Sequence, residues 1–343
     1  MGLSKKQIEE IRIHLDECKN PLFLFDDDQD GLCSFLQLYR YKREGKGFIV
    51  KTVPKIDISF VQKAKNYNPD KIFILDMAIV EQEFLDEVNV SVIWIDHHQP
   101  LQREKVHYYN PRNAKPHENF PTSYLCHQIV EQDHWIAAVG CVADWVIPEF
   151  LDDVKKEFPD LINSKSKNPG DIIYNTQLGH LIRIISFVLK GKSEDVSKCI
   201  KIMTRIKSPY EILNKETPEG KFLYKRFEAM NKLYEPLLDD AINEAKNSGK
   251  IALFKYYDGK MSFTSDLGNE LIYKFPDKII IIAREKNGDM KCSLRSSKID
   301  LRPLIEKSLI GLSGYGGGHE HACGLNVSKP DFDEFLRRFE EMI

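Results

Sequence analysis

Short apolar runs alternate with amphipathic segments through the first hundred residues of the chain. Runs that are short and mostly apolar are typical of buried strands, and we expect them at 21–25, 48–53, 71–75 and 92–95. Between these runs, apolar positions are spaced among charges as in helices, over 4–18, 34–41 and 58–65. Strands that alternate with helices predict an α/β fold with a parallel sheet, which binds ligands beyond the carboxyl ends of its strands.

The pattern changes twice further along the chain. Residues 122–131 and 136–145 predict helices, and the segment from 150 to 245 is polar and mostly helical in pattern, with long charged amphipathic stretches over 210–246. Further strands are expected at 251–256, 278–283 and 290–295, before a glycine-rich loop. The chain therefore divides into an N-terminal α/β domain over 1–190, a helical connector over 191–247 and a smaller α/β domain over 248–343.

Acidic or imidazole side chains directly follow four apolar runs. These clusters are Asp26-Asp27-Asp28-Gln29-Asp30, Asp76, Asp96-His97-His98 and Asp144. If the first cluster is extended, its alternate residues Asp26, Asp28 and Asp30 point to the same side. Each cluster alone also fits a structural role, such as a solvated acidic loop, a helix N-cap or a buried acid bonded to backbone amides.

Together, the clusters place several carboxylates and two imidazoles at one edge of the predicted sheet. Unpartnered carboxylates at close range repel one another, and a divalent cation offsets that repulsion. A set rich in oxygen with one or two imidazoles suits Mn²⁺ or Mg²⁺ better than structural zinc, and the imidazoles favour Mn²⁺. Carboxylates that bridge two metal ions are the usual arrangement for phosphoester hydrolysis.

The composition bears on the partners and the cellular compartment that we expect for this protein. The sequence is 42% hydrophobic and 29% charged with a net charge of −3, so the chain as a whole has no basic field that indicates nucleic acid, although 49 Lys and Arg allow a local basic groove. Neither a signal peptide nor a span of about 20 apolar residues is recognisable, so we expect a cytoplasmic protein without a membrane partner. The seven scattered Cys residues predict reduced thiols.

The four clusters resemble, in order, the motifs of the DHH phosphoesterase superfamily. Asp28-Gln29-Asp30-Gly31 resembles its first motif, and Asp76, Asp96-His97-His98 and Asp144 resemble the next three. The segment 316–324, Gly-Gly-Gly-His-Glu-His-Ala-Cys-Gly, resembles the signature of the DHH-associated C-terminal domain. The spacing of Asp26, Asp28 and Asp30 is similar to that of archaeal RecJ-like single-strand nucleases. Other branches carry a His where this chain has Leu24.

The resemblance implies a role for each motif residue. Two Mn²⁺ ions, with Mg²⁺ as the alternative, would be held by Asp28, Asp30, Asp76, His97 and Asp144, and Asp76 would bridge them. Asp26 would be a ligand or lie directly behind one, His98 would contact the scissile phosphate or assist the leaving group, and Asp96 would orient an imidazole. In a C-terminal substrate-binding domain, the rest of the substrate would contact Arg295, Gly316, Gly317, Gly318 and His319.

Three functions fit these features. The first is a Mn²⁺-dependent exonuclease that hydrolyses single-stranded DNA or RNA by two-metal activation of water and works with replication or repair proteins. The second is a phosphodiesterase for short oligonucleotides (nanoRNA), cyclic dinucleotides or 3′-phosphoadenosine phosphate. The third is a replication or repair scaffold without activity. Dependence of hydrolysis on strand length separates the first two, and absence of metal-dependent hydrolysis would indicate the third.

Overall fold

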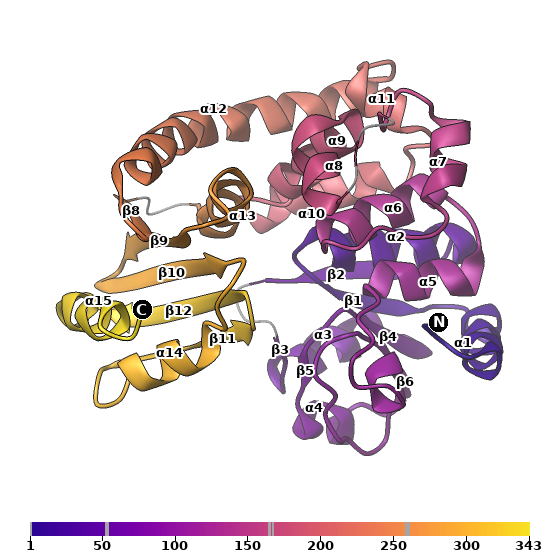
Figure 1. Ribbon diagram of the computed structural model, residues 1–343. Coiled ribbons are helices and arrows are strands. Elements are labelled where there is room, and N and C mark those ends of the chain that lie inside the picture. Colours follow the sequence, from indigo (N-terminus) through magenta and orange to yellow (C-terminus); the bar gives the residue numbers. More distant parts are fainter. Residues whose placement is uncertain (1, 52–54, 164–165, 167, 258–260) are drawn as a thin grey trace. The chain divides into compact units, whose positions relative to one another are not determined.

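A five-stranded parallel sheet forms the centre of the N-terminal part of the chain (Figure 1). Its strand order is β2-β1-β4-β6-β7. The strands are β1 (Leu22–Asp26), β2 (Lys46–Val50), β4 (Lys71–Leu75), β6 (Ser91–Ile95) and β7 (His107–Tyr109). A separate two-stranded parallel ladder joins β3 (Lys55–Ile56) and β5 (Ile79–Val80). The parallel α/β sheet predicted from the sequence is therefore confirmed.

Helices cover both faces of this sheet because successive strand residues point to opposite sides. Phe25 of β1 stacks on Phe35 of α2 (Gln29–Lys42), with ring centroids 4.6 Å apart. Leu22 and Leu24 belong instead to the core that includes α3 (Ser59–Tyr67) and α4 (Gln82–Glu87). The helices packed with α2 are α5 (Thr122–Val130), α6 (His134–Ala143) and, at the edge, α1 (Lys5–Glu17).

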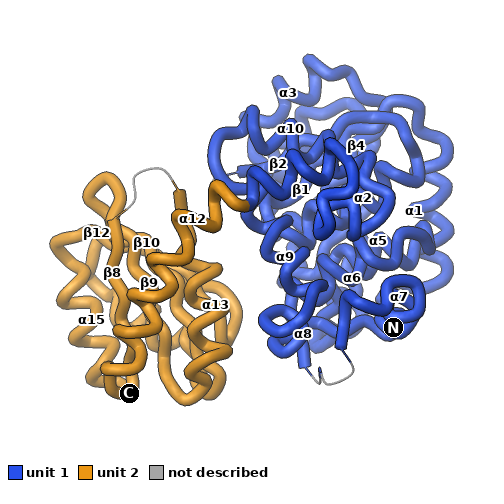
Figure 2. Tube along the Cα trace, turned by 90° about the horizontal axis from the view of Figure 1, so that it is seen from above, with its two compact units in different colours: residues 1–227 blue, residues 228–343 orange. Residues whose placement is uncertain are grey.

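The structure is a computed structural model that describes residues 2–51, 55–163, 166, 168–257 and 261–343. The last part of the strand expected at 48–53 lies outside these residues. Contacts divide the chain into unit 1, residues 1–227, and unit 2, residues 228–343 (Figure 2). The 30-residue helix α12 (Pro218–Asn247) crosses this division. The domain and connector boundaries expected from the sequence stay predictions.

The segment between the parallel sheet and unit 2 is helical, as its pattern predicts. It contains α7 (Leu151–Glu157), α8 (Pro169–Asn175), α9 (Gln177–Val188), α10 (Ser193–Met203) and α11 (Pro209–Leu213). Helix α9 packs on α6, so these helices extend the α2 side of unit 1. Within the described part of the chain, no helix is both long and apolar enough to cross a bilayer.

Unit 2 is a mixed sheet with helices on both faces. Its strand order is β11-β12-β10-β9-β8, with β8 and β9 parallel and the other pairs antiparallel. The strands are β8 (Ile251–Tyr257), β9 (Ile279–Lys286), β10 (Asp289–Ser296), β11 (Gly314–His319) and β12 (Ala322–Ser328). Helix α13 (Thr264–Lys274) contacts β9 and β10, while α14 (Arg302–Ser308) and α15 (Phe332–Glu340) share the core on the opposite face.

Two expectations about local structure are wrong. Helix α2 begins at Gln29 with Asp28 as its N-cap, so Asp30 lies in the first helical turn. Asp26, Asp28 and Asp30 are therefore not alternate residues of one extended segment. The glycine-rich segment is the edge strand β11 and not a loop, because its backbone pairs with β12. The seven cysteines are all buried and free.

Candidate metal centre and active site

The acidic clusters lie at the carboxyl ends of three adjacent parallel strands. Asp26 ends β1, Asp76 follows β4 and Asp96 follows β6, and these strands are neighbours in the sheet. Parallel strands end at the same edge, so side chains that are far apart in the sequence meet there. The site predicted at this edge is therefore assembled by the sheet itself.

Asp76 is the centre of the cluster. It belongs to two groups of side chains whose ligand atoms all lie within 4.8 Å of one another: one with Asp26 and Asp28, the other with His97 and His98. Its side chain is 2% exposed, and burial, followed by the charges of the neighbouring aspartates, raises its pKa well above the usual range. Carboxylates forced together in this way form a set of oxygen donors that suits a divalent cation.

The backbone holds Asp76 in an unusual conformation. Its φ is 60°, in the left-handed region, where few residues other than Gly, Asn and Asp are found. The Asp76 amide donates to the carbonyl of Ile95 at 3.0 Å, and the Thr122 hydroxyl donates to Asp76 Oδ1 at 2.9 Å. Hydrogen bonds with β6 and α5 therefore stabilise this strained backbone conformation and fix the carboxylate at the sheet edge.

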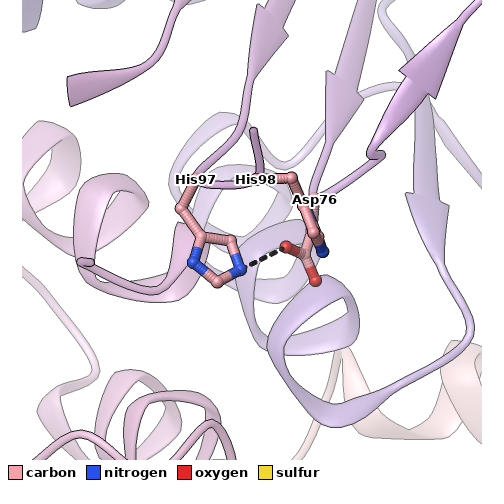
Figure 3. A group of neighbouring side chains, drawn as sticks. All are labelled: Asp76, His97 and His98. Atoms are coloured by element: carbon pink, nitrogen blue, oxygen red, sulfur yellow. Dashed lines mark ion pairs between the residues drawn. The ribbon is translucent and has the colours of Figure 1, made fainter. Parts of the chain in front are cut away.

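His97 turns one ring nitrogen toward Asp76 (Figure 3). Its Nε2 lies 3.5 Å from Asp76 Oδ1, whereas its Nδ1 lies 3.1 Å from Asn119 Oδ1 and 3.8 Å from Asp144 Oδ2. A proton on Nδ1 would be donated to Asn119 and would leave the Nε2 lone pair facing Asp76. This arrangement is the one a metal-binding imidazole needs.

Asp96 orients the second imidazole. The Asp96 side chain is fully buried, and its Oδ1 lies 2.7 Å from His98 Nδ1. Its Oδ2 accepts hydrogen bonds from the Tyr108 hydroxyl at 3.1 Å and the Asn110 amide at 3.2 Å. Burial alone would lower the pKa of His98, but the hydrogen bond and charge of Asp96 outweigh it and raise the pKa to about 9. His98 is therefore suited to donate a hydrogen bond to an anion.

Asp28 and Asp30 each bind a helix N-terminus. Asp28 caps α2, where its Oδ1 accepts from the Gly31 amide at 2.9 Å. Asp30 is 3% exposed and accepts from the Thr122 amide at 2.7 Å, from the Ser123 amide at 2.9 Å and from the Ser123 hydroxyl. Asp30 is close enough for its charge to raise the pKa of Asp76, but only its remaining lone pairs could bind a metal.

Asp26 and Asp144 complete the acidic cluster. Burial, then the charges of Asp28 and Asp27, raise the pKa of Asp26 well above its usual range. Asp144 is the C-cap of α6, and its side chain is 35% exposed. Despite this exposure, the surrounding protein removes enough water from the carboxylate to raise the pKa of Asp144 to about 7, although the charge of His97 acts in the opposite direction. The carboxylates and imidazoles brought together here therefore fit hard divalent ions by donor type.

The expected substrate-binding residues lie in unit 2. Arg295 Nε donates to Asn269 Oδ1 at 2.6 Å, and the strand register aligns Arg295 with Ala322 and Ala322 with His319. Residues in one such row share a face of the sheet, so Arg295 and His319 lie on the same side.

Two residues along the strands from this row, a pair of glycines leaves the backbone uncovered. Gly317 pairs with Gly324, and a Cβ on either would meet nothing within 4 Å. Gly316 is different, since a Cβ there would lie 2.9 Å from Ile305 Cγ2 of α14, and Gly318 has a φ of 144°. Gly317 and Gly324 thus form an open stretch of backbone on the same face, two residues along the strands from the row of His319, Ala322 and Arg295.

Sequence reasoning missed the residues that support the cluster. They are Tyr108, Asn110, Asn119, Thr122 and Ser123. A signal was present for two of them, because Thr122 and Ser123 stand at the start of the helix expected over 122–131, where Ser and Thr are common. Asn119 lies in an irregular segment and had no comparable signal.

Comparison with known families agrees with this geometry. The DHH family N-terminal domain matches residues 23–158, and the DHHA1 domain matches residues 250–343. The chain carries a DHH domain followed by a DHHA1 domain. The superfamily resemblance found in its motifs is therefore confirmed. No protein of curated function matches the sequence.

Solved structures share this fold at low sequence identity. RecJ from Thermus thermophilus in complex with Mn²⁺ has a TM-score of 0.70 at 16% identity, and the match covers 100% of this chain and 55% of RecJ. The Mg²⁺ complex of the same protein has a TM-score of 0.57 at 17% identity, and the match covers 100% of this chain and 53% of RecJ. An exonuclease RecJ bound to manganese has a TM-score of 0.66 at 16% identity, and the match covers 99% of this chain and 95% of that protein. CDC45 from Entamoeba histolytica has 0.55 at 9%, over 99% of both chains. The chain thus spans about half of the Thermus thermophilus RecJ, and these likenesses establish the fold.

Proposed function

We propose that this DHH–DHHA1 chain is a metal-dependent phosphodiesterase, an exonuclease that hydrolyses single-stranded DNA or RNA. The observation that carries the proposal is Asp76, which two groups of ligand atoms share at the end of the parallel sheet. A carboxylate shared in this way is what a pair of metal ions about 3.5–4 Å apart requires. RecJ structures with Mn²⁺ and with Mg²⁺ support the choice of ion.

The acidic cluster would divide its side chains between two sites. Asp26 and Asp28 would join Asp76 at one site, while His97, Asp144 and the remaining lone pairs of Asp30 would join it at the other. Bound there, divalent ions would supply an acidified water and neutralise charge that develops on the phosphate. The Asp28 and Asp30 side chains are fixed by the N-termini of α2 and α5, so the donors would need little rearrangement.

His98 and unit 2 would act on the substrate. His98, held by Asp96 through Nδ1, would donate a hydrogen bond from its other ring nitrogen to the scissile phosphate or a proton to the leaving oxygen. In unit 2, the uncovered backbone at Gly317 and Gly324 lets a phosphate approach closely, with Arg295 and His319 as further donors.

The test is hydrolysis of end-labelled single strands of DNA and RNA, from dinucleotides to long strands, in Mn²⁺, Mg²⁺ or EDTA. We expect stepwise, metal-dependent shortening of long strands. The Asp76→Asn variant should lose this activity, because Asn carries no charge to bind metal. It should still fold, because Asn tolerates a φ of 60° and can keep the Thr122 hydrogen bond.

The matched control is Asp152→Asn, which removes an acid that is 77% exposed on α7 and should retain activity. Activity confined to the shortest strands would favour a small-substrate phosphodiesterase. No hydrolysis with any metal would favour a scaffold, and full activity of Asp76→Asn would refute the site.

A further inference from the structure

Trp145 combines two unfavourable features next to the acidic cluster. Its φ is 62°, in the left-handed region, where a bulky side chain is a genuine outlier. Its side chain is also among the exposed large hydrophobic ones, at 41%. Helices commonly end with Gly or Asn in this conformation, because these residues adopt it at low cost. A Trp here therefore suggests a use outside the packing of the protein.

Trp145 differs from the other two tryptophans of the sequence in its exposure. The other two tryptophans are 0% and 2% exposed, and Trp94 Nε1 donates to the Met77 carbonyl at 3.0 Å. Trp145 has a backbone bond, from its amide to the Val142 carbonyl at 3.0 Å. No aromatic ring or cation of the described residues is recorded against its indole. Part of the side chain, which is 41% exposed, is thus open to a flat partner.

The backbone fixes Trp145 beside the proposed metal ligands. It directly follows Asp144, whose Oδ2 lies 3.8 Å from His97 Nδ1. The Val146 amide donates to the Cys141 carbonyl at 2.9 Å, and this bond closes the turn at the end of α6. Consecutive Cα atoms are about 3.8 Å apart, so the indole is attached within one residue of the centre.

We propose that Trp145 stacks on a nucleobase of the substrate strand next to the scissile phosphate. The inference rests on the proposed function and adds recognition of a base to the recognition of phosphate. Stacking on an aromatic side chain tolerates any base, because every base presents a π-face. Trp145 therefore positions a strand without selecting its sequence, and a strand without bases loses this contact.

Tryptophan fluorescence tests the contact without turnover. In EDTA, a single-stranded oligonucleotide should quench the emission of the wild-type protein, and the signal is assigned to Trp145 because the other two indoles are buried. An abasic strand of the same length should quench far less. Trp145→Phe should remove the quenching. Equal effects of the two strands, or no quenching by either, would overturn the proposal.

Kinetics with Mn²⁺ separate stacking from a structural role. Trp145→Asn relieves the backbone strain and removes the ring, so we expect a higher melting temperature together with a KM for long strands raised roughly 5- to 100-fold. A tryptophan needed for packing would instead lower the melting temperature when replaced. Trp145→Phe should keep part of the affinity.

The control is Ile147→Asn, which changes a neighbouring apolar residue that is equally exposed, at 41%, and should leave KM unchanged. Wild-type hydrolysis tests the proposed function by itself. If the wild type hydrolyses strands and Trp145→Asn has the same KM, only the stacking proposal is overturned.

Discussion

Asp96 is a buried carboxylate that serves the histidine two positions after it. It bonds to His98 Nδ1 at 2.7 Å, while Tyr108 and Asn110 donate to its other oxygen. A buried charge surrounded by donors is stable only while they stay in place. The charged form of His98 is therefore stabilised most by Asp96, which has no ligand atom in either group around Asp76, and less by the charges of Asp28 and Asp144.

The Asp96→Asn variant tests this dependence. Loss of the negative charge should lower the pKa of His98 from about 9 and should reduce kcat at neutral pH roughly 100-fold, with little change in Mn²⁺ affinity. The measurement is kcat as a function of pH, together with a Mn²⁺ titration. Tyr108→Phe, which removes one donor to Asp96, should have a milder effect. A wild-type pH profile in Asp96→Asn would contradict the assigned role.

His127 makes unit 1 sensitive to acid. Its ring is 8% exposed and stacks on Phe150 with centroids 4.1 Å apart, and burial, followed by the charge of His134, lowers its pKa to about 4. Below pH 6.5 the unfolded chain binds a proton that the folded chain does not. The free energy of unfolding should therefore fall between pH 6.5 and about 4, by roughly 3 kcal/mol.

Urea unfolding at a series of pH values measures this loss. His127→Phe keeps the stacking on Phe150 but cannot be protonated, so its stability should fall less over the same range. If the wild type and His127→Phe lose stability in parallel, His127 is not the cause.

Among the elements, α2 and α5 show how the centre is held. Their N-termini both meet the acidic cluster, and each is bonded by one of its carboxylates, Asp28 or Asp30. The dipole of a helix favours negative charge at its N-terminus, which offsets part of the repulsion among the acids. Gly31 permits this close approach, since a Cβ there would lie 2.7 Å from the carbonyl oxygen of Asp26.

Strand β11 allows glycines with different roles to be separated. A Cβ at Gly317 meets nothing within 4 Å, so Gly317→Ala should fold normally but cover the backbone and raise KM. Gly318 has a φ of 144°, and a Cβ there would lie 2.5 Å from the Ala322 carbonyl oxygen. Gly318→Ala should therefore cost on the order of 1 kcal/mol or more of stability. Thermal unfolding and KM distinguish the two, and an unchanged KM for Gly317→Ala would argue against phosphate binding there.

For the whole molecule, the division into two units predicts a local response to metal. The candidate ligands come from β1, α2, β4, β6 and α6 or the residues next to them, all in unit 1, so Mn²⁺ should slow hydrogen exchange in unit 1 and leave β11 and β12 unchanged. At a free concentration 100 times Kd, the stabilisation is about 2.7 kcal/mol. EDTA should reverse it and Asp76→Asn should abolish it. Equal protection of both units would contradict this prediction.

The arrangement of the site was predictable where it followed strand ends. Asp26, Asp76 and Asp96 follow apolar runs, and parallel strands bring such residues to one edge. The direction of the Asp30 side chain was not predictable. It depends on Asp28 capping helix α2, but Asp28 lies within a run of acids that fits an extended segment equally well. Partners such as Thr122 and Asn119 come from segments whose position depends on tertiary packing, which periodicity does not report. The strand at β11 was missed because glycines weaken the local preference for strand.

Strand β11 is exposed throughout and lies at the edge of its sheet. An edge of this kind presents unpaired amides and carbonyls to any neighbouring chain and is a potential site of aggregation. Glycines contribute few side chains that could interlock with a second sheet, so the same residues that leave the backbone accessible also discourage self-assembly. Replacing these glycines with residues that favour strands would thus be a poor route to a more stable protein, because the exposed edge would then pair more readily with other chains and aggregate.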